Sequence, residues 1–421
     1  MAQTKVKSGL IDGSLSTEWD STIQTSNFTA AAGTGYFVNT TSNAITISLP
    51  AGVVGNEVII QDYAGTFATN KVVFASNGSE KIQGSTDDYK CITNNATVNL
   101  VYQDTTKGWT ADNIEIDTIT VEYLVVAGGG SGSGFYRAGG GGAGGLRTSY
   151  GSTSGGGASA ESNLALNFAT NYTVTVGGGG TGASNVEGAN GSDSVFSTIT
   201  SSGGGKGGRY TGTTGTAGSA GGSGGGGGGD ATGGAGGAGT TNQGYAGGAG
   251  SSSVQCGGGG GGAGAVGQTG GSGATDGDGG DGIQSTVLNY TNAGTASVGE
   301  QISGSEVWYG GGGGGGSYSS GNDTIPGKGG GGEGTSPSTY PGNGGNGTAN
   351  TGGGGGGASG ETSPGSGIGG SGGSGCVILR YPSTYTLTIG AGLTQSTGSP
   401  FTEASNKISV FTGGTGNIQF S

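Results

Sequence analysis

The sequence predicts an all-β protein built around a bundle of polyglycine II helices, with essentially no α-helix. Three observations support this fold class. Glycine supplies 113 of the 421 residues, against a usual share of about 7%. The hydrophobic residues make up only 29% of the chain, which is too few for a conventional core of this size. No segment of ten or more residues shows a 3.6-residue apolar period, so helices are not expected to matter.

Residues 26–117 are expected to form an antiparallel, sandwich-like β-domain. Short runs rich in Val, Ile, Tyr and Phe are separated here by turn signals such as Asn77-Gly78. In the stretch 45–49 the apolar side chains alternate with Thr and Ser, as they do in a half-buried strand. The preceding residues, 1–25, are interpreted as a candidate attachment peptide.

Residues 118–382 are expected to form the glycine-rich bundle of left-handed helices. Four uninterrupted glycine runs have nearly equal lengths of six, six, seven and six residues: 224–229, 257–262, 310–316 and 352–357. A flexible linker has no reason to repeat run lengths. Polyglycine II has three residues per turn, and without Cβ atoms such helices can approach until each N–H bonds a neighbouring carbonyl. Collagen is excluded, because Pro totals only 7.

Residues 383–421 return to β alternation in stretches such as YTLTIGAGL, which predicts a small C-terminal β-module. The three cysteines, Cys91, Cys256 and Cys376, lie far apart and include no CxxC pair. We therefore expect free thiols, made in a reducing cytoplasm.

Catalytic chemistry is not expected, and neither is a cofactor or a metal. The chain has no histidine, which excludes Ser-His-Asp and Cys-His pairs and His-based zinc sites. The glycines after VEYLVVA have no helix behind them to seat a pyrophosphate. Lys206 and Lys328 are not followed by the Ser or Thr of a P-loop. Asp276, Asp278 and Asp281 suggest a calcium loop, but their spacing departs from the nonapeptide pattern and favours a turn.

The charge balance argues against nucleic acid as a partner. Asp and Glu total 26 against 13 Lys and Arg, for a net charge of -13, and the basic residues are scattered. No apolar stretch of 18 residues and no signal-peptide core are found, so membrane insertion is not expected.

The order of motifs resembles the glycine-rich domain of tail fibres and receptor-binding adhesins from tailed phages, especially those of marine cyanobacteria and other marine hosts. The matching stretches are YLVVAGGG at 123–130, NYTVTVGGGG at 171–180, DSVFSTITSSGGGKGG at 193–208, WYGGGGGGGS at 308–317 and GGSGCVILRYP at 372–382. The stretch GYFVNTTSNAITISLPAG also looks like the β-domain that precedes such regions. The resemblance implies a virion protein, made in the host cytoplasm, whose polyglycine II sandwich displays receptor-binding loops at one end.

Receptor-binding loops need aromatic and amide side chains, because ring faces stack on sugars and amides hydrogen-bond to hydroxyls. The candidate receptor-binding residues that interrupt the glycine are Phe135, Tyr136, Arg209, Tyr210, Asn242, Tyr245, Tyr318, Asn322 and Tyr340. By contrast, Trp308 and Tyr309 are assigned to a packed strand.

The leading functional hypothesis is a virion appendage, a tail fibre or adhesin that binds a host surface glycan or outer-membrane protein. Its N-terminal region would contact other virion proteins. The alternative is a structural spacer or capsid decoration protein without a receptor of its own. The sequence leaves open the host, the receptor and the oligomeric state, for which a homotrimer is one option.

Overall fold

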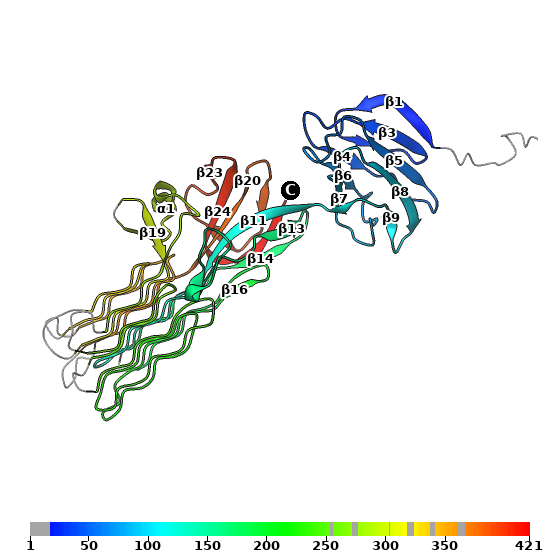
Figure 1. The fold of residues 1–421 in the computed structure, drawn as a ribbon. Coiled ribbons are helices and arrows are strands. Elements are labelled where there is room, and N and C mark those ends of the chain that lie inside the picture. Colours follow the sequence, from blue (N-terminus) through cyan, green and yellow to red (C-terminus); the bar gives the residue numbers. More distant parts are fainter. Residues whose placement is uncertain are drawn as a thin grey trace, which may run out of the picture. The chain divides into compact units, whose positions relative to one another are not determined.

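The computed structural model describes residues 17–184, 186–252, 256–271, 277–302, 304–317, 324–336, 342–359 and 367–421. The chain forms two compact units, which are described separately (Figure 1). The first comprises residues up to Ile119 together with Leu166–Thr170. The second comprises Thr120–Ala165 and Asn171–Ser421.

The first unit consists of two five-stranded sheets. One sheet has the strand order β1 (Glu18–Gln24), β3 (Thr34–Val38), β5 (Glu57–Asp62), β8 (Thr97–Asp104) and β9 (Gly108–Thr110). The other has the order β10 (Glu115–Ile116), β7 (Tyr89–Cys91), β6 (Val72–Ala75), β4 (Ile45–Ser48) and β2 (Phe28–Thr29). The alternation predicted for residues 45–49 is confirmed, because Ile45, Ile47 and Leu49 are fully buried in the core between the sheets.

The prediction that this domain is antiparallel is wrong for half of its pairings. Strands β1, β3 and β5 are parallel to one another, and so are β2, β4 and β6. The reason is that successive strands up to β6 alternate between the two sheets, so a strand that returns to its sheet runs in the original direction. Only from β7 onward do neighbouring strands pair antiparallel. Turn signals show where the chain bends, but not whether it stays in one sheet.

Strand β1 shortens the predicted attachment peptide. Residues 18–24 pair with β3 as part of the first sheet. Residues 1–16 lie outside the described residues. The stacked rings of Trp19 and Phe37, whose centroids are 4.7 Å apart, join this edge strand to its neighbour.

The second unit contains an 11-stranded sheet. Its main path is β12 (Leu146–Thr148), β11 (Thr118–Val126), β20 (Cys376–Pro382), β24 (Asn406–Phe420), β14 (Tyr172–Thr175), β15 (Ser194–Phe196) and β16 (Ile199–Ser201). The side members are β13 (Leu164–Asn167) on β11, and β21 (Leu387–Ile389), β22 (Leu393–Gln395) and β23 (Phe401–Glu403) on β24. Strands β21 to β24 of the predicted C-terminal β-module, residues 383–421, therefore share one sheet with β20.

A smaller sheet and a single short helix complete the regular structure of the described residues. The sheet has the order β17 (Ile283–Gln284), β19 (Glu306–Tyr309) and β18 (Glu300–Ile302). The helix α1 (Tyr290–Ala296) is capped by the Asn289 side chain, which accepts a bond from the Asn292 N–H; a single 3-10 turn spans Gly155–Gly157. Tyr309 is fully buried, which confirms the packed strand. No described helix is long and apolar enough to cross a membrane.

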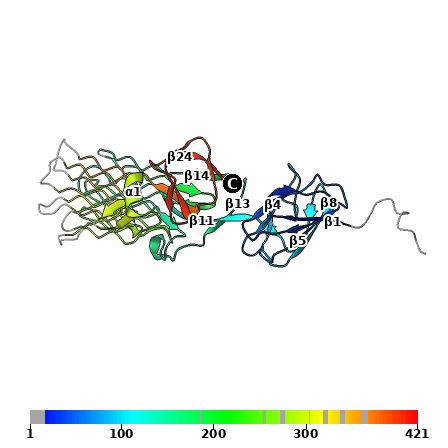
Figure 2. The same cartoon turned by 90° about the horizontal axis from the view of Figure 1, so that it is seen from above.

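The glycine-rich segments of the second unit run side by side without being strands (Figures 1 and 2). Along 139–144 the backbone N–H groups donate to three neighbouring segments in turn, and every third residue returns to the same segment. The N–H groups of Gly139 and Gly142 donate to the carbonyls of Gly208 and Gly205, respectively. Those of Gly140 and Ala143 donate to Gly258 and Gly261, and those of Gly141 and Gly144 donate to Gly355 and Gly352. The carbonyl groups accept from three further segments, 130–133, 223–229 and 310–316.

Segment 138–145 thus has six hydrogen-bonded neighbours and a bonding period of three residues. Three residues per turn is the period of polyglycine II, so this pattern supports the helix type, which stays a prediction. The all-β class with essentially no α-helix is confirmed.

Close approach explains why these positions are glycine. A Cβ built at Gly139 would overlap the carbonyl oxygen of Gly226, one built at Gly259 that of Asp278, and one built at Gly354 that of Gly141. The neighbouring backbone occupies the space that a side chain would need. The bundle is therefore held by backbone hydrogen bonds at distances that only glycine allows.

The three cysteines are buried free thiols, as predicted. Cys376 lies in β20, and burial raises the pKa of its thiol to about 12. At neutral pH it is protonated and behaves as a small apolar side chain.

Candidate functional site

Two of the predicted loops meet at the end of the glycine segments that lies away from β11, β12 and β16. Segment 127–133 leads away from β11 and segment 138–145 leads back to β12, so the loop 134–137 lies at that end. The segment that follows β16 runs alongside and ends at Arg209 and Tyr210. The bond from Gly139 N–H to the Gly208 carbonyl joins the two at this end.

Three aromatic rings are in contact at this end. The ring centroids of Phe135 and Tyr136 are 4.5 Å apart at an interplanar angle of 86°, and those of Tyr136 and Tyr210 are 5.5 Å apart at 65°. Phe135 and Tyr210 are separated by 6.1 Å. These are favourable edge-to-face and tilted geometries. Tyr136 is only 6% exposed, so Phe135 and Tyr210, both half-buried, are the rings that a ligand can reach.

A buried ion pair supports the rings from one side. The guanidinium of Arg137 lies 5.1 Å from the centroid of the Tyr210 ring and 3.8 Å from the carboxylate of Asp230. Both charged side chains are about nine-tenths buried. The cation–π contact and the ion pair together fix the orientation of Tyr210. We call Phe135, Tyr136, Arg137, Tyr210 and Asp230 the tip cluster.

The backbone of the tip cluster is strained. Phe135 has φ of 79° and Arg137 has φ of 46°, a left-handed region that bulky residues rarely adopt. Such a conformation costs about 1 to 3 kcal/mol and persists only where surrounding contacts enforce it. Strain of this kind concentrates at binding and active sites, so together with the ring contacts it favours this loop as a candidate site.

Charged and polar groups border the tip cluster. The Lys206 ammonium lies 2.9 Å from the Glu187 carboxylate, and Glu187 also accepts a bond from the Thr216 hydroxyl at 3.1 Å. The bond from Lys206 holds the pKa of Glu187 below its usual range. Arg209 is half-buried beside them, and its backbone N–H donates to the Thr216 hydroxyl. Lys206 and Arg209 thus place polar groups on the segment that leads to the half-buried ring of Tyr210.

The other predicted candidates are not part of the tip cluster. Asn242 and Tyr245 lie at the opposite end of the bundle, where the adjacent Gln243 carbonyl accepts a bond from Leu146 in β12. Asn242 there lines a cavity of about 270 Å³. Arg147 and Glu161 also line this cavity, and the Arg147 guanidinium donates to both carboxylate oxygens of Glu161. Tyr318, Asn322 and Tyr340 lie outside the described residues.

Sequence reasoning missed a set of Asn and Asp side chains that bond to the backbone of neighbouring glycine segments. The bonds run from Ile325 N–H to Asp278, Lys328 N–H to Asp281, Ile368 N–H to Asn343 and Ser371 N–H to Asn346. Donors and acceptors both advance in steps of three residues. The signal that could have found them is the spacing in DGGD at 278–281 and NGGN at 343–346.

This pattern also explains two acids of the suspected calcium loop. Asp278 and Asp281 accept backbone N–H groups of one adjacent segment, a role that the turn interpretation did not foresee. Asp276 lies outside the described residues. Where the structure describes the chain, no group of three potential metal ligands is found.

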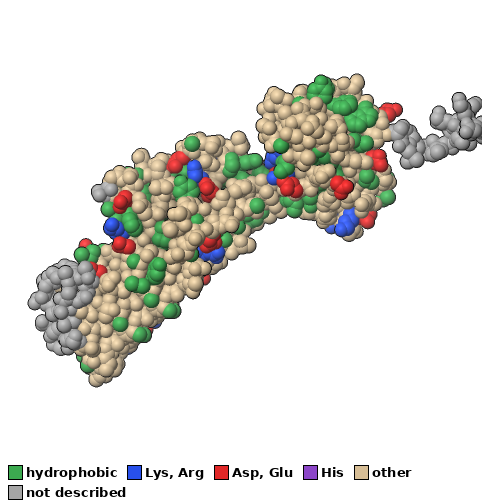
Figure 3. Space-filling model, in the orientation of Figure 1, with side chains coloured by type: hydrophobic (Ala, Val, Ile, Leu, Met, Phe, Trp, Pro, Cys, Tyr) green, Lys and Arg blue, Asp and Glu red, His purple; other side chains and the backbone are tan. Residues whose placement is uncertain are grey.

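Charged side chains are few and scattered over the bundle face visible in Figure 3.

In a comparison with known protein families, a family model described as a glycine-rich domain matches residues 105–382. None of the curated proteins compared with the chain matches it.

Proposed function

The chain belongs to the glycine-rich domain family, whose model covers residues 105–382, and from this premise and the tip cluster we propose that it is a non-enzymatic virion appendage. As a tail fibre or adhesin it recognises a host cell-surface receptor through loops displayed on a rigid polyglycine bundle. The receptor is a surface glycan or an outer-membrane protein. Through its N-terminal region the chain contacts other virion proteins.

The observation that carries this proposal is the strained, prearranged tip cluster. Tyr210 is oriented by Arg137, and Phe135 is held at a positive φ. Rings fixed before binding lose little conformational entropy when a partner arrives. Tyrosine and arginine are also the side chains that most often dominate binding energy at protein interfaces, and an aromatic face equally stacks on the C–H face of a sugar.

Support for a contact through the N-terminal region comes from β1. Among the described residues this strand is at the edge of its sheet, and one side of its backbone pairs with no other strand. Its Trp19 and Ile23 side chains are exposed. An edge strand with exposed apolar side chains suits attachment to another protein.

A purely structural spacer is the second candidate. It is favoured by the burial of Tyr136 and Arg137, because a cluster that only closes the end of the bundle would bury its side chains in the same way. The two functions differ in whether the outer rings contact anything beyond the chain.

The test is binding of fluorescently labelled protein to a panel of marine bacterial strains. We expect Phe135→Ala and Tyr210→Ala each to weaken binding to a positive strain by about 1 to 3 kcal/mol. Tyr245→Ala is the matched control, because this tyrosine lies at the opposite end of the bundle. Melting curves verify that all variants are folded. If no strain binds the parent, or both tip variants bind as well as the parent, the spacer function replaces the receptor-binding one.

A further inference from the structure

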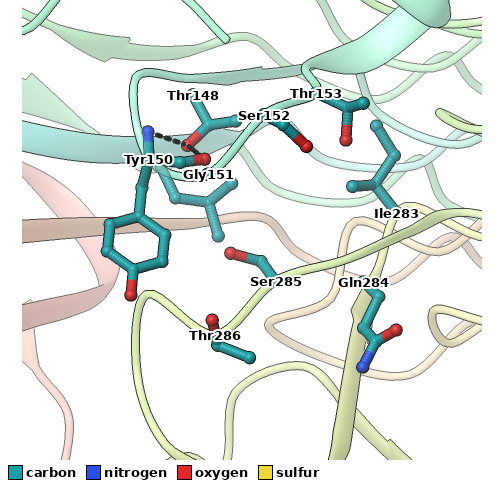
Figure 4. A pocket seen from close by; sticks show the side chains of 10 residues that line it. Thr148, Tyr150, Gly151, Ser152, Thr153, Ile283, Gln284, Ser285 and Thr286 are labelled. Atoms are coloured by element: carbon teal, nitrogen blue, oxygen red, sulfur yellow. Dashed lines mark hydrogen bonds between the residues drawn. The ribbon is translucent and has the colours of Figure 1, made fainter.

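A small neutral pocket opens at the sheet end of the second unit, between the loop after β12 and residues 283–286, which comprise β17 and the two residues after it. It has a volume of about 150 Å³. Its lining includes Leu124, Tyr150, Ser152, Thr153, Ile283 and Thr286 (Figure 4). The tip cluster lies at the other end of the glycine segments, so this pocket is a separate feature.

The pocket has an apolar floor and a fixed aromatic wall. Ile283 and Tyr150 are half-buried and form the apolar surface that a ligand can reach, and both pack against the hydrophobic core that contains the fully buried Leu124. The guanidinium of Arg380 lies 5.2 Å from the centroid of the Tyr150 ring. Arg380 is itself held by Glu122 at 3.0 Å. The aromatic wall is therefore in place before any ligand binds.

The rim consists of hydroxyl and amide groups. The side chains of Ser152, Thr153, Gln284 and Thr286 make no hydrogen bond to any residue that the structure describes. Figure 4 shows the hydroxyls of Ser152 and Thr286 directed into the space between the two chain segments. None of the residues that line the pocket is charged.

We propose that this pocket binds one unit of a neutral saccharide. A sugar ring has a C–H face that suits the apolar floor, and its hydroxyls both donate and accept hydrogen bonds. Ser and Thr hydroxyls and the Gln amide do the same. An anionic ligand would lose hydration without meeting a cation in the lining, which is unfavourable. A volume of about 150 Å³ is below the roughly 300 to 1,000 Å³ of sites for drug-sized ligands, which suits one ring rather than a longer chain.

The experiment uses the full chain and three probes: the methyl glycosides of glucose, galactose and mannose. Saturation-transfer difference NMR detects binding, and a titration gives the affinity. We expect at least one glycoside to bind, and glucose 6-phosphate to bind more weakly than its neutral counterpart. Thr153→Val and Thr286→Val each remove one hydroxyl with little change of shape. Each should weaken binding about threefold to tenfold, the effect of one neutral hydrogen bond.

Two controls make the result specific. Thr241→Val removes an exposed hydroxyl that lines the other cavity, and Tyr210→Ala alters the tip cluster; both should leave the affinity unchanged. Having two rim variants keeps the test valid if one of them fails to fold. The proposal is overturned if none of the three glycosides shows saturation transfer. It is equally overturned if the folded rim variants bind as the parent does, or if glucose 6-phosphate binds as tightly as the neutral sugar.

Discussion

The first unit and the glycine bundle bury their backbones in opposite ways. In the first unit two sheets pack on large apolar side chains, and Ile45, Ile47, Phe74 and Trp109 are fully buried. In the bundle, segment 138–145 is buried along its whole length, although its largest side chains are the methyl groups of Ala138 and Ala143. Its N–H and C=O groups bond to six surrounding segments. One region is stabilised by apolar area, the other by backbone hydrogen bonds that require the absence of side chains.

The comparison predicts opposite responses to substitution. A buried β-strand tolerates a change of one methyl group better than the loss of several, because the cost grows with the cavity. A glycine inside the bundle does not tolerate the addition of a side chain, because the backbone of another segment lies where its Cβ would be. The first two of the following predictions test this contrast directly, and the other two concern polar side chains of the bundle.

The largest effect is expected from side chains placed inside the bundle. Gly259→Val and Gly354→Val should each cost several kcal/mol, more than the roughly 1 to 3 kcal/mol typical of overpacking, because the new Cβ would overlap a neighbouring carbonyl oxygen. Gly178→Val is the matched control, since a Cβ there meets nothing within 4 Å. Thermal melts measure all three. Equal melting temperatures for the interior variants and the control would contradict close packing.

In the first unit, loss of side-chain volume should be the damaging change. Ile47→Ala is expected to cost about 2 to 5 kcal/mol, and Ile47→Val only about 0.5 to 1.5 kcal/mol, because a smaller cavity remains. Denaturant unfolding, with a probe on the first unit, gives both values. If Ile47→Ala were as mild as Ile47→Val, this core would not be tightly packed.

A smaller effect is expected at the edge of the bundle. Asn346→Ala removes the acceptor of the Ser371 N–H and should cost about 0.5 to 1.5 kcal/mol, the net value of one hydrogen bond. Gln268→Ala is the control, because this exposed amide side chain makes no hydrogen bond among the described residues. Similar stabilities for the two variants would mean that the Asn side chains do not hold the edge.

The smallest effect concerns pH. The bond from Lys206 lowers the pKa of Glu187 in the folded protein, so the pair stabilises the fold above the ordinary glutamate value of 4.5. That contribution is lost as pH falls through the lower, folded value. The pair is partly exposed and should contribute less than about 1 kcal/mol. The parent should melt slightly above Glu187→Gln at pH 7, and this difference should vanish near pH 3; a constant difference would exclude the ion pair as its cause.

The sequence predicted elements whose signal is local. The Ile45 and Ile47 alternation specified a half-buried strand, and the strand character of Tyr309 followed from its neighbours. Matched glycine runs predicted packed segments without side chains. The parallel pairing of β1, β3 and β5 was missed, because the choice between a hairpin and a crossing to the other sheet depends on contacts far apart in sequence.

The candidate site was predictable in composition but not in place. Phe135, Tyr136 and Tyr210 were singled out as loop residues, and the structure brings them together. Asn242 and Tyr245 have the same local signal but lie at the other end of the bundle, because alternate loops of an up-and-down chain occupy opposite ends. The ion pair between Arg137 and Asp230 could not be predicted, because the two residues are 93 positions apart and no local pattern links them.

Hydrogen exchange tests the central claim most directly, that neighbouring segments satisfy the glycine backbone. The amides of Gly140–Gly142 and Gly224–Gly229 each donate to another segment, so they should exchange as slowly as the amides of strand β5. The amide of Gly178, which is exposed and donates to no group among the described residues, should exchange fast and serves as the internal reference. Exchange of the interior amides at the rate of Gly178, near that of a free peptide, would contradict the bundle and return these runs to a flexible linker.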